Sequence, residues 1–350
     1  MKNNKSTYII GEIGQNHNGS VDIAKLIIDI VNRDIRDELF DNSLKKIDAI
    51  KLTKRDLTEE LSVSSMNKPY LSPHSFGKTY GEHRQFLELS NEEHFEIFKY
   101  SKLNGLDFIE TLTSKGTLSL LKLFLPDKIK IASRDLTNLP LLKAIAETNI
   151  PIILSTGMAG KKELDDALTI ITKSHNNISI LHCLSEYPAQ YKNINLFTIP
   201  YLKKNYSQYR IGYSDHSIGI SIPVAAVALG AEIIEKHITL DRKMKGTDQA
   251  GSLGANGVWR MVRDIRNMEM SLGKEEIIIS NSVVQAKNKL ERSIATKANL
   301  DVGHIISEDD LHLLSPGDGF RWSNKNNIIG KKIIKKINKN EIIYKEFLSK

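Results

Sequence analysis

The stretch Gly212-Tyr-Ser-Asp-His-Ser-Ile-Gly219, followed by Glu235-Lys-His-Ile-Thr-Leu-Asp241, decides the fold. Each part follows a short apolar run and opens into polar chain, which is how a buried β-strand ends at a functional loop. The apolar segment 220–229 between them, closed by a glycine, predicts a crossover helix. His216 and His237 are therefore predicted at the same end of two neighbouring parallel strands. Because adjacent strands lie about 4.8 Å apart, the two imidazoles could share one ion, or each could be bonded within its own loop.

The same alternation of short apolar runs and amphipathic segments extends over most of the chain. Strands are predicted at 8–13, 47–52, 106–110, 128–132, 151–154 and 178–181, and helices include 117–124. Eight βα units with polar residues after nearly every strand predict a (β/α)8 TIM barrel. The alternative is an open doubly wound sheet, but its polar motifs would gather at one switch point. The long polar stretch 53–81 is predicted to be a functional loop over the active-site face.

The pattern of apolar residues changes towards the C-terminal end of the sequence, where short apolar pairs alternate with predicted turns. We predict a catalytic barrel over residues 1–280, a linker over 281–291 and a small β-rich domain over 292–350. A domain of about 60 residues buries little apolar surface, so we expect it to pack against a partner.

Composition narrows the class of protein. The chain has 350 residues, 49 Lys and Arg against 42 Asp and Glu, and a net charge of +7. Arginine is sparse and no basic stripe is interleaved with aromatic residues, which argues against a nucleic-acid partner and favours a small anionic substrate. The only cysteine, Cys183, excludes a disulfide framework and is expected to be a small buried residue. The polar start of the chain shows no signal peptide or membrane span, which predicts a cytoplasmic protein.

Basic and hydroxyl side chains follow the predicted strands on one rim. Lys51 and Lys130 stand at strand ends two strands apart, and the hydroxyls around the same rim belong to Ser133, Ser155, Ser185 and Ser214. Two ammonium groups with hydroxyls and loop amides form a site for a tetrahedral anion such as phosphate, although each lysine could instead be a surface charge. The carboxylates that could orient a histidine or accept a proton are Glu12, Asp215, Glu235 and Asp248.

Several motifs resemble those of the sialic acid (N-acetylneuraminate) synthase family. They run in the family's order over nearly the whole chain: Gly11–Gly19, Lys130–Ser133, Leu154–Met158, Leu181–Cys183, Tyr187-Pro188, Gly212–His216, Glu235–His237, Leu240-Asp241 and Arg292-Ser293. The tail, with Gly303, Asp310-Leu311 and Pro316–Gly319, is similar to the antifreeze-like (SAF) domain that closes this family's proteins.

The resemblance implies a transferase that condenses phosphoenolpyruvate (PEP) with an aldehyde sugar of the N-acetylmannosamine type. Such a reaction releases phosphate and a nine-carbon 2-keto acid for surface-glycan biosynthesis. By resemblance His216 and His237 bind Mn²⁺ or Mg²⁺, and Glu12 is the catalytic acid. The positions matching substrate contacts are Lys51, Lys130, Ser133, Ser155, Ser214 and Thr111 for PEP, and Tyr187 and Asp248 for the acceptor. Ser185 is also expected to bind substrate, although its residue type departs from the family pattern. The resemblance also implies a homodimer in which the SAF domain covers the partner's barrel.

Four positions depart from the family pattern. Thr53 and Ser315 replace a glutamine and an arginine, Ser185 replaces an asparagine, and Gln249 stands where histidine is common. Arg321 could replace the missing tail arginine. We therefore predict that PEP chemistry is kept and that acceptor recognition is altered. The alternatives are a synthase with an acceptor of the legionaminic or pseudaminic acid type and, from another class, a phosphate-binding barrel or hydrolase without condensation activity.

Overall fold

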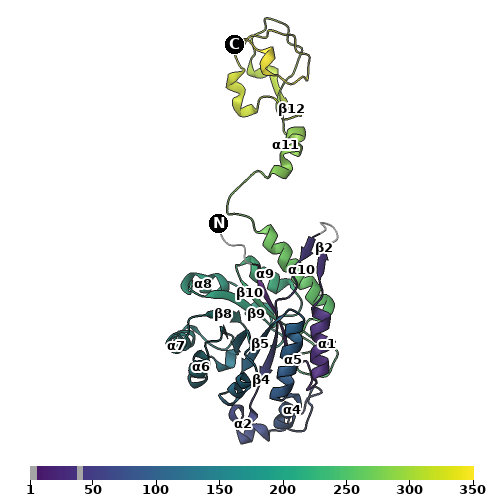
Figure 1. The fold of residues 1–350 in the computed structure, drawn as a ribbon. Coiled ribbons are helices and arrows are strands. Elements are labelled where there is room, and N and C mark those ends of the chain that lie inside the picture. The colour runs from purple at the N-terminus through teal and green to yellow at the C-terminus, as the bar shows by residue number, and fades with distance from the viewer. Residues whose placement is uncertain (1–5, 38–41) are drawn as a thin grey trace. The chain divides into compact units, whose positions relative to one another are not determined.

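The computed structural model describes residues 6–37 and 42–350, and the chain forms two compact units, Met1–Gly273 and Lys274–Lys350 (Figure 1). In the first unit eight parallel strands close into a barrel in the order β1-β10-β9-β8-β7-β6-β5-β4. They are β1 (Tyr8–Gly14), β4 (Ala49–Lys54), β5 (Asp107–Leu112), β6 (Lys128–Ile131), β7 (Ile152–Ser155), β8 (Ile178–Cys183), β9 (Arg210–Asp215) and β10 (Ile233–His237). The last strand pairs with the first. The predicted TIM barrel is confirmed, and the open sheet is excluded.

Helices cover the outside of the barrel (Figure 1). They are α1 (Val21–Val31), α5 (Asn91–Leu103), α6 (Leu139–Ala146), α7 (Lys161–Ile171), α8 (Thr198–Asn205), α9 (Ser221–Ala228) and α10 (Ala255–Ser271). Ser20 caps α1 by accepting a hydrogen bond from the Ile23 amide at 3.3 Å. The α-helix predicted over 117–124 was wrong in type, because Gly116–Lys122 is a 3₁₀ helix. The proline at 126 disfavours helical backbone just before it, which leaves room only for a short, tight connector.

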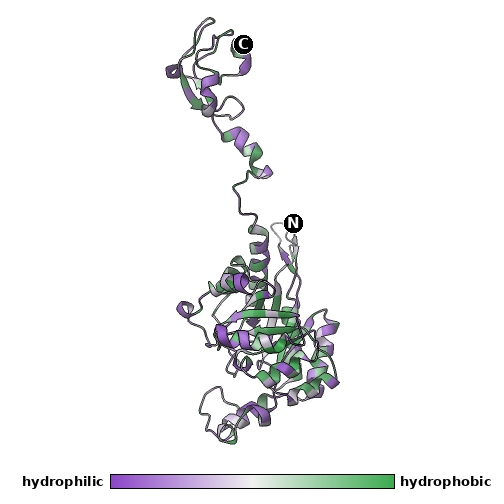
Figure 2. Ribbon diagram, turned by 90° about the vertical axis from the view of Figure 1, so that its left-hand side faces the viewer, coloured by the Kyte–Doolittle hydropathy of each residue, from purple (hydrophilic) through white to green (hydrophobic). Residues whose placement is uncertain are grey.

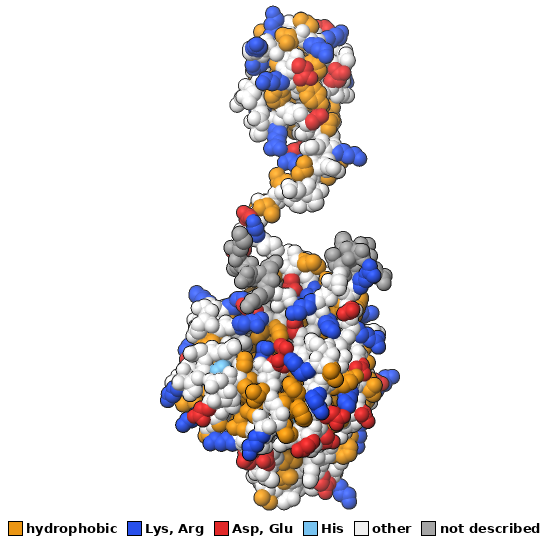
Figure 3. Space-filling view, in the orientation of Figure 1, with side chains coloured by type: hydrophobic (Ala, Val, Ile, Leu, Met, Phe, Trp, Pro, Cys, Tyr) orange, Lys and Arg blue, Asp and Glu red, His pale blue; other side chains and the backbone are white. Residues whose placement is uncertain are grey.

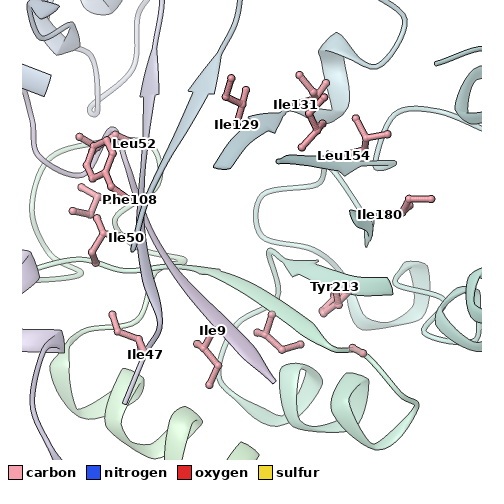
Figure 4. Close-up of a cluster of buried hydrophobic side chains, with 14 of the residues drawn as sticks. Ile9, Ile47, Ile50, Leu52, Phe108, Ile129, Ile131, Leu154, Ile180 and Tyr213 are labelled. Atoms are coloured by element: carbon pink, nitrogen blue, oxygen red, sulfur yellow. The ribbon is translucent and has the colours of Figure 1, made fainter. Parts of the chain in front are cut away.

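The main core lies between the strands and the outer helices. Ile50, Leu52 and Phe108 lie together on the neighbouring strands β4 and β5 and are fully buried (Figure 4). Hydrophobic residues run along the strands at the centre of this unit, and the outer faces of its helices are hydrophilic (Figure 2). Basic and acidic side chains are spread over the face of this unit that Figure 3 shows. A parallel sheet is normally covered on both faces. Here the helices cover its outer face, and side chains inside the barrel cover its inner face.

A second apolar cluster fills the barrel interior. It contains Ile10, Ala49, Ile109, Ile153, Leu181 and Ile233, all at most 1% exposed. Successive side chains of a strand point to opposite faces, so the residue two positions further along faces the interior as well. An apolar layer therefore fills the barrel interior. The next inward-facing residue of each strand, two positions further along, lies above this layer towards the carboxyl ends of the strands.

The stretch 53–81, predicted as a functional loop, contains short helices as well as irregular chain. It contains the short helices α2 (Leu57–Glu60) and α3 (Val63–Met66) and leads into α4 (Tyr80–Leu87). A capping box between Thr79 and Glu82 starts α4. A Cβ on Gly81 would stand 2.7 Å from the Met66 carbonyl oxygen, so only glycine lets α4 approach α3 this closely. The antiparallel pair β2 (Ile35–Asp37) and β3 (Asn42–Leu44) was not predicted either.

The second unit is a small β-rich domain, as predicted. It comprises α11 (Val284–Leu290) and the antiparallel strands β11 (Ser293–Thr296) and β12 (Leu311–Leu314). Its own core includes Ile294, Leu300, Ile306, Leu311, Ile328, Ile333, Ile337 and Ile343. The remaining 3₁₀ segments of the chain are Ser133–Asp135, Tyr191–Asn193, Asn281–Val283, Glu308–Asp310, Trp322–Asn327 and Lys345–Phe347. Within the described residues, none of the helices combines the length and apolarity needed to span a bilayer.

Candidate active site

A cavity of about 440 Å³ lies at the carboxyl ends of the barrel strands, a size typical of small-molecule sites. Every site residue predicted from the sequence lines it: Glu12, Lys51, Thr111, Lys130, Ser133, Ser155, Ser185, Tyr187, Ser214, His216, His237 and Asp248. The structure therefore brings together residues that are spread over more than two hundred positions of the chain.

The floor of the cavity follows from strand geometry. Glu12, Lys51, Thr111, Ser155 and Glu235 each stand two residues after a member of the apolar interior cluster and line the cavity. A strand with alternating faces turns both residues inward. The polar floor therefore lies directly above the apolar interior cluster. This cluster excludes water from beneath the site, and the lower local dielectric strengthens the electrostatic interactions there.

Two lysines and two carboxylates form a buried charge cluster on this floor. The Nζ atom of Lys51 forms an ion pair with Glu12, lies 3.8 Å from Oε1 of Glu235, and donates a hydrogen bond to Oγ1 of Thr111 at 3.2 Å. The Nζ atom of Lys130 lies 3.4 Å from the same Glu235 oxygen, which also accepts a hydrogen bond from Ser214 at 2.9 Å. Glu235 thus joins the two lysines that were predicted to bind an anion.

The two carboxylates differ in their protonation. Burial raises the pKa of Glu12 to about 7, with Lys51 offsetting part of the effect. Burial also opposes ionisation of Glu235, but the charges of Lys130 and Lys51 outweigh it and lower its pKa to about 2. Near neutral pH the cluster therefore holds one ionised carboxylate and one that can carry a proton, the division expected of an acid and a charge partner.

Hydroxyl groups gather around Gly157, which follows β7. Its amide donates a hydrogen bond to Oγ of Ser133 at 2.9 Å. A Cβ at Gly157 would come within 2.8 Å of that oxygen and within 2.5 Å of Oγ of Ser185, so the close approach requires glycine. Oγ of Ser155 is buried without a hydrogen-bond partner. Since buried polar atoms are normally satisfied, this hydroxyl is free to bind a ligand oxygen.

The two histidines lie together at the ends of β9 and β10, as predicted. Their ring centroids are 5.6 Å apart, and the ring of Tyr187 lies 4.0 Å from that of His216. Nδ1 of His216 is bonded to the Leu184 carbonyl at 2.7 Å, which fixes the ring and leaves Nε2 as its ligating nitrogen. Nδ1 of His237 is buried without a partner. Burial lowers the pKa of His237, so its imidazole is neutral and able to bind a metal.

The histidine pair fits a metal site in which substrate completes the coordination. Across the described chain no cluster of three or more His, Cys, Asp or Glu side chains is arranged to hold an ion. Asp215, expected as a possible partner of an imidazole, does not serve as one. It accepts hydrogen bonds from the Tyr213 hydroxyl at 2.9 Å and from the Ser217 amide at 2.9 Å, and pairs with buried Lys236. Asp215 therefore anchors the loop that carries His216.

Cys183 is buried, as predicted, but it also lines the cavity. Its Sγ atom lies 3.8 Å from Nδ1 of His216. Among the positions that depart from the family pattern, Thr53 and Ser185 line the cavity, whereas Gln249 is fully buried and donates hydrogen bonds to Asn16 and Asn18. The exchange at Gln249 is thus structural.

In the second unit, Oγ of Ser315 donates a hydrogen bond to the Leu290 carbonyl at 3.0 Å. The Arg321 guanidinium lies 3.5 Å from a carboxylate oxygen of Glu291. Arg321 is therefore occupied by a partner within its own unit.

The sequence analysis missed a group of cavity residues on and around α4. They are Gln15, Arg55, Tyr70, Tyr80, His83, Arg84 and Arg134. Three of these seven, Arg55, Tyr70 and Tyr80, fall in the stretch 53–81 that was predicted to be a functional loop over the active-site face. The Thr79-x-x-Glu82 pattern was the available signal, because a capping box predicts that a helix begins there.

Comparison with known proteins agrees with this architecture. The NeuB family model matches residues 42–277, and the SAF domain model matches residues 291–349. The first match covers more than half of the chain. This chain belongs to the NeuB family.

Its relatives are sugar-acid synthases of several kinds. The chain is 32% identical over 342 residues to the human N-acetylneuraminate-9-phosphate synthase, covering 97% of this chain and 92% of that protein. It is 34% identical over 342 residues to the N,N'-diacetyllegionaminic acid synthase of Campylobacter jejuni, covering 97% and 99%. The solved N-acetylneuraminic acid synthetase of Leptospira borgpetersenii, in complex with citrate, matches with a TM-score of 0.66 and 30% identity over 82% of this chain and 93% of that chain.

This NeuB-family chain is a PEP-dependent nonulosonic acid synthase with a TIM barrel and a C-terminal SAF domain. It condenses PEP with a sugar. Membership in this family argues against the alternative of a phosphate-binding barrel without condensation activity.

Proposed function

We propose that this enzyme condenses PEP with the open-chain aldehyde of a hexosamine related to N-acetylmannosamine, for surface-glycan biosynthesis. The observation that carries the proposal is the arrangement of the cavity. Lys51 and Lys130, which suit a multiply charged anion, lie on its floor. The histidine pair, Tyr187 and Asp248 line the same cavity, so both reactants can be held at once.

PEP would occupy the floor. Its phosphate would take hydrogen bonds from the Ser133, Ser155 and Ser185 hydroxyls around Gly157, and its carboxylate would lie against Thr111. The two ammonium groups would stabilise both anionic groups through charge-assisted hydrogen bonds. Binding would replace the contacts that the lysines now make with Glu235.

The reaction then balances without any further reagent. Carbon C3 of PEP bonds to the aldehyde carbon, using the electron pair of the enol double bond, and the aldehyde oxygen takes the proton of Glu12. Water adds to the electron-poor C2 and returns a proton to Glu12. The tetrahedral intermediate collapses as the C2–O bond to phosphate breaks, leaving the 2-keto acid and inorganic phosphate, which keeps the remaining proton.

His216 and His237 would hold a Mn²⁺ or Mg²⁺ ion through one nitrogen each. Bound there, the ion would supply Lewis-acid polarisation of the aldehyde. The free Nδ1 of His237 and the fixed tautomer of His216 support this assignment. Glu12 approaches the same place, because a Cβ on Gly14 would contact both its Oε1 atom and the ring of His237.

The acceptor would lie against Tyr187 and Asp248. Since Thr53 and Ser315 offer fewer polar contacts than glutamine and arginine, N-acetylmannosamine itself would be a weak substrate, and a differently substituted hexosamine would be preferred. Relatives named for an N-acetylneuraminate 9-phosphate and for N,N'-diacetyllegionaminic acid support acceptor variation on one scaffold.

We further propose a cytoplasmic homodimer in which the SAF domain covers the cavity of the partner subunit, with domain limits of 1–280, 281–291 and 292–350. The small core of the SAF domain supports the need for a partner surface. A solution monomer that kept full activity after truncation at Lys287 would contradict the dimer.

The decisive experiment is an assay of phosphate release with PEP, a panel of aldehyde sugars and Mn²⁺. Release that requires both PEP and an aldehyde supports condensation. Release from PEP alone would instead favour a hydrolase.

A further inference from the structure

Three arginines line the cavity, and their charge partners differ. Arg55 lies 3.3 Å from Glu88 and 3.7 Å from Glu60, and Arg134 lies 3.2 Å from Glu60. Both guanidinium groups are therefore neutralised by carboxylates. Arg84 has no carboxylate within ion-pairing distance among residues 6–37 and 42–350. Its charge faces the cavity without compensation.

Arg84 is held by neutral groups only. Its Nη1 donates to Oε1 of Gln15 at 2.9 Å, while Nε and Nη2 donate to the Tyr80 hydroxyl at 2.8 and 2.6 Å. The guanidinium carbon lies 5.0 Å from the centre of the Tyr80 ring. Neutral acceptors form weaker hydrogen bonds to a cation than anions do. An anionic ligand would therefore bind the Arg84 guanidinium more strongly than Gln15 and Tyr80 do.

The position of Arg84 is fixed by packing. It lies on α4, whose buried His83 accepts a hydrogen bond from the Phe76 amide at 3.2 Å. The stacked rings of Phe76 and Phe86 lie 4.6 Å apart. A Cβ on Gly19 would come within 2.4 Å of the Phe86 carbonyl oxygen, so the loop after β1 contacts α4 directly. Arg84 is therefore presented by a rigid element.

Arg84 also lies away from the hydroxyls proposed for PEP. It is tied to Gln15, which directly follows β1, the strand that carries Glu12 and approaches His237. In the closed barrel β7, which carries Ser155, is four strands from β1 in either direction. Arg84 is thus on the side of Glu12 and His237, across the barrel from Ser155.

We propose that Arg84 is the specificity-determining residue of a second anion subsite, which binds a phosphate monoester on the acceptor sugar. The inference rests on the proposed condensation and names the class of its acceptor. A phosphate on the anomeric carbon would block the open-chain aldehyde, so the monoester must be on another carbon. An acyl carbonyl is neutral and would leave the charge of Arg84 uncompensated, whereas a phosphate dianion matches the guanidinium fork.

The first test is equilibrium binding to the Mn²⁺-loaded enzyme with saturating PEP. The probes are 2-acetamido-2-deoxymannitol and its 6-phosphate, which lack an aldehyde and cannot react. We expect the phosphorylated probe to bind roughly 10- to 100-fold more tightly, as expected of charge-assisted bonds. Arg84→Gln should abolish this difference, and Arg84→Lys should keep part of it.

The matched control is Arg263→Gln, which removes the same charge from an arginine on α10 that pairs with Asp264. It should leave both affinities unchanged. Equal affinity of the two probes for the wild-type enzyme would overturn the proposal, and so would a preference that persists in Arg84→Gln. Weaker PEP binding in Arg84→Gln would place the arginine at the other anion site and would also overturn it.

Turnover separates this inference from the proposed function. With Arg84 in the role proposed, Arg84→Gln should raise KM for a phosphorylated hexosamine at least about tenfold while changing kcat little. Unphosphorylated sugars should be affected much less. If only unphosphorylated sugars were condensed, the Arg84 assignment would be wrong and the proposed synthase activity would still hold. The binding experiment tests the Arg84 subsite even if no sugar is turned over.

Discussion

The Oε1 atom of Glu235 lies 3.4 Å from the Nζ atom of Lys130, and both side chains are almost fully buried. The same carboxylate reaches Lys51. Without substrate, Glu235 therefore compensates Lys130, which has no other carboxylate within ion-pairing distance among the described residues, and adds to the pairing of Lys51 with Glu12. Such a residue stabilises the free enzyme and keeps the lysines charged for the arriving anion.

We expect Glu235→Gln to be less stable than the wild type. Removing one partner of a buried ion pair costs roughly 3 kcal/mol or more, because the remaining charge stays desolvated. Denaturant unfolding measures this difference. PEP should stabilise the variant more than the wild type, since its charge can replace the missing carboxylate.

Glu232→Gln is the matched control. Glu232 lies just before β10 and pairs with Lys203 at 3.1 Å, but its side chain is 46% exposed. Loss of this pair should change the free energy of unfolding by less than about 1 kcal/mol. Equal destabilisation by the two variants would show that Glu235 is not needed to neutralise the lysines.

Glu12 should give the pH–rate profile its alkaline limb. A carboxyl with a pKa of about 7 is protonated below that pH and loses its proton above it. An acid that must donate a proton is therefore lost as pH rises, and kcat/KM, which reports the groups of the free enzyme, should fall above about pH 7. Glu12→Gln should lower kcat roughly 10²- to 10⁴-fold and remove the limb, which should persist in Glu232→Gln. An unchanged limb in Glu12→Gln would assign it to another group.

The positions of individual site residues could be predicted because strand patterns are local. Lys51 ends a short apolar run, and a strand with a period of two residues turns it to the same face as Ala49. The same reasoning located Lys130, Ser155 and His237. Each was placed correctly at the mouth of the barrel.

The partners of those residues could not be predicted, because they depend on closure of the barrel. Glu235 on β10 meets Lys130 on β6, although three strands separate them in the sheet. No pattern along the sequence predicts a contact across the barrel interior. Arg84 was missed for another reason. It lies on α4, which begins at the end of the stretch 53–81 and is fixed by its capping box and by packing of Gly81 against Met66 rather than by hydrophobic periodicity.

Lys130→Ala should weaken PEP binding far more than acceptor binding. Charge-assisted hydrogen bonds to an anion contribute roughly 1.5–3 kcal/mol each, so KM for PEP should rise at least about tenfold. Lys128→Ala is the control, because Lys128 lies two residues earlier on β6, at the opposite end of the strand, and pairs with Asp107. Steady-state kinetics with each substrate varied in turn would measure the effect. Unchanged affinity for PEP in Lys130→Ala would place the anion elsewhere.

His237→Ala should lower the affinity for Mn²⁺ and abolish turnover while the barrel stays folded. The variant removes one of only two imidazoles at the proposed site, and partly exposed His237 contributes little to the main core. His74→Ala, which removes an exposed imidazole, should change neither property. Calorimetric titration with Mn²⁺ and circular dichroism would follow binding and folding separately. Equal Mn²⁺ affinity in wild type, His216→Ala and His237→Ala would rule out the histidine site.

Thr53→Gln should improve the use of N-acetylmannosamine. Thr53 lines the cavity two residues beyond Lys51 on β4 and offers one hydroxyl, whereas glutamine would present an amide donor and acceptor to an N-acyl group. One neutral hydrogen bond contributes about 0.5–1.5 kcal/mol, so kcat/KM for this sugar should rise roughly two- to tenfold, with KM for PEP unchanged. Thr53→Val, which keeps the shape and removes the hydroxyl, should give no gain. If wild type already uses N-acetylmannosamine better than every other sugar tested, the exchange at Thr53 is neutral and the acceptor is the unmodified sugar.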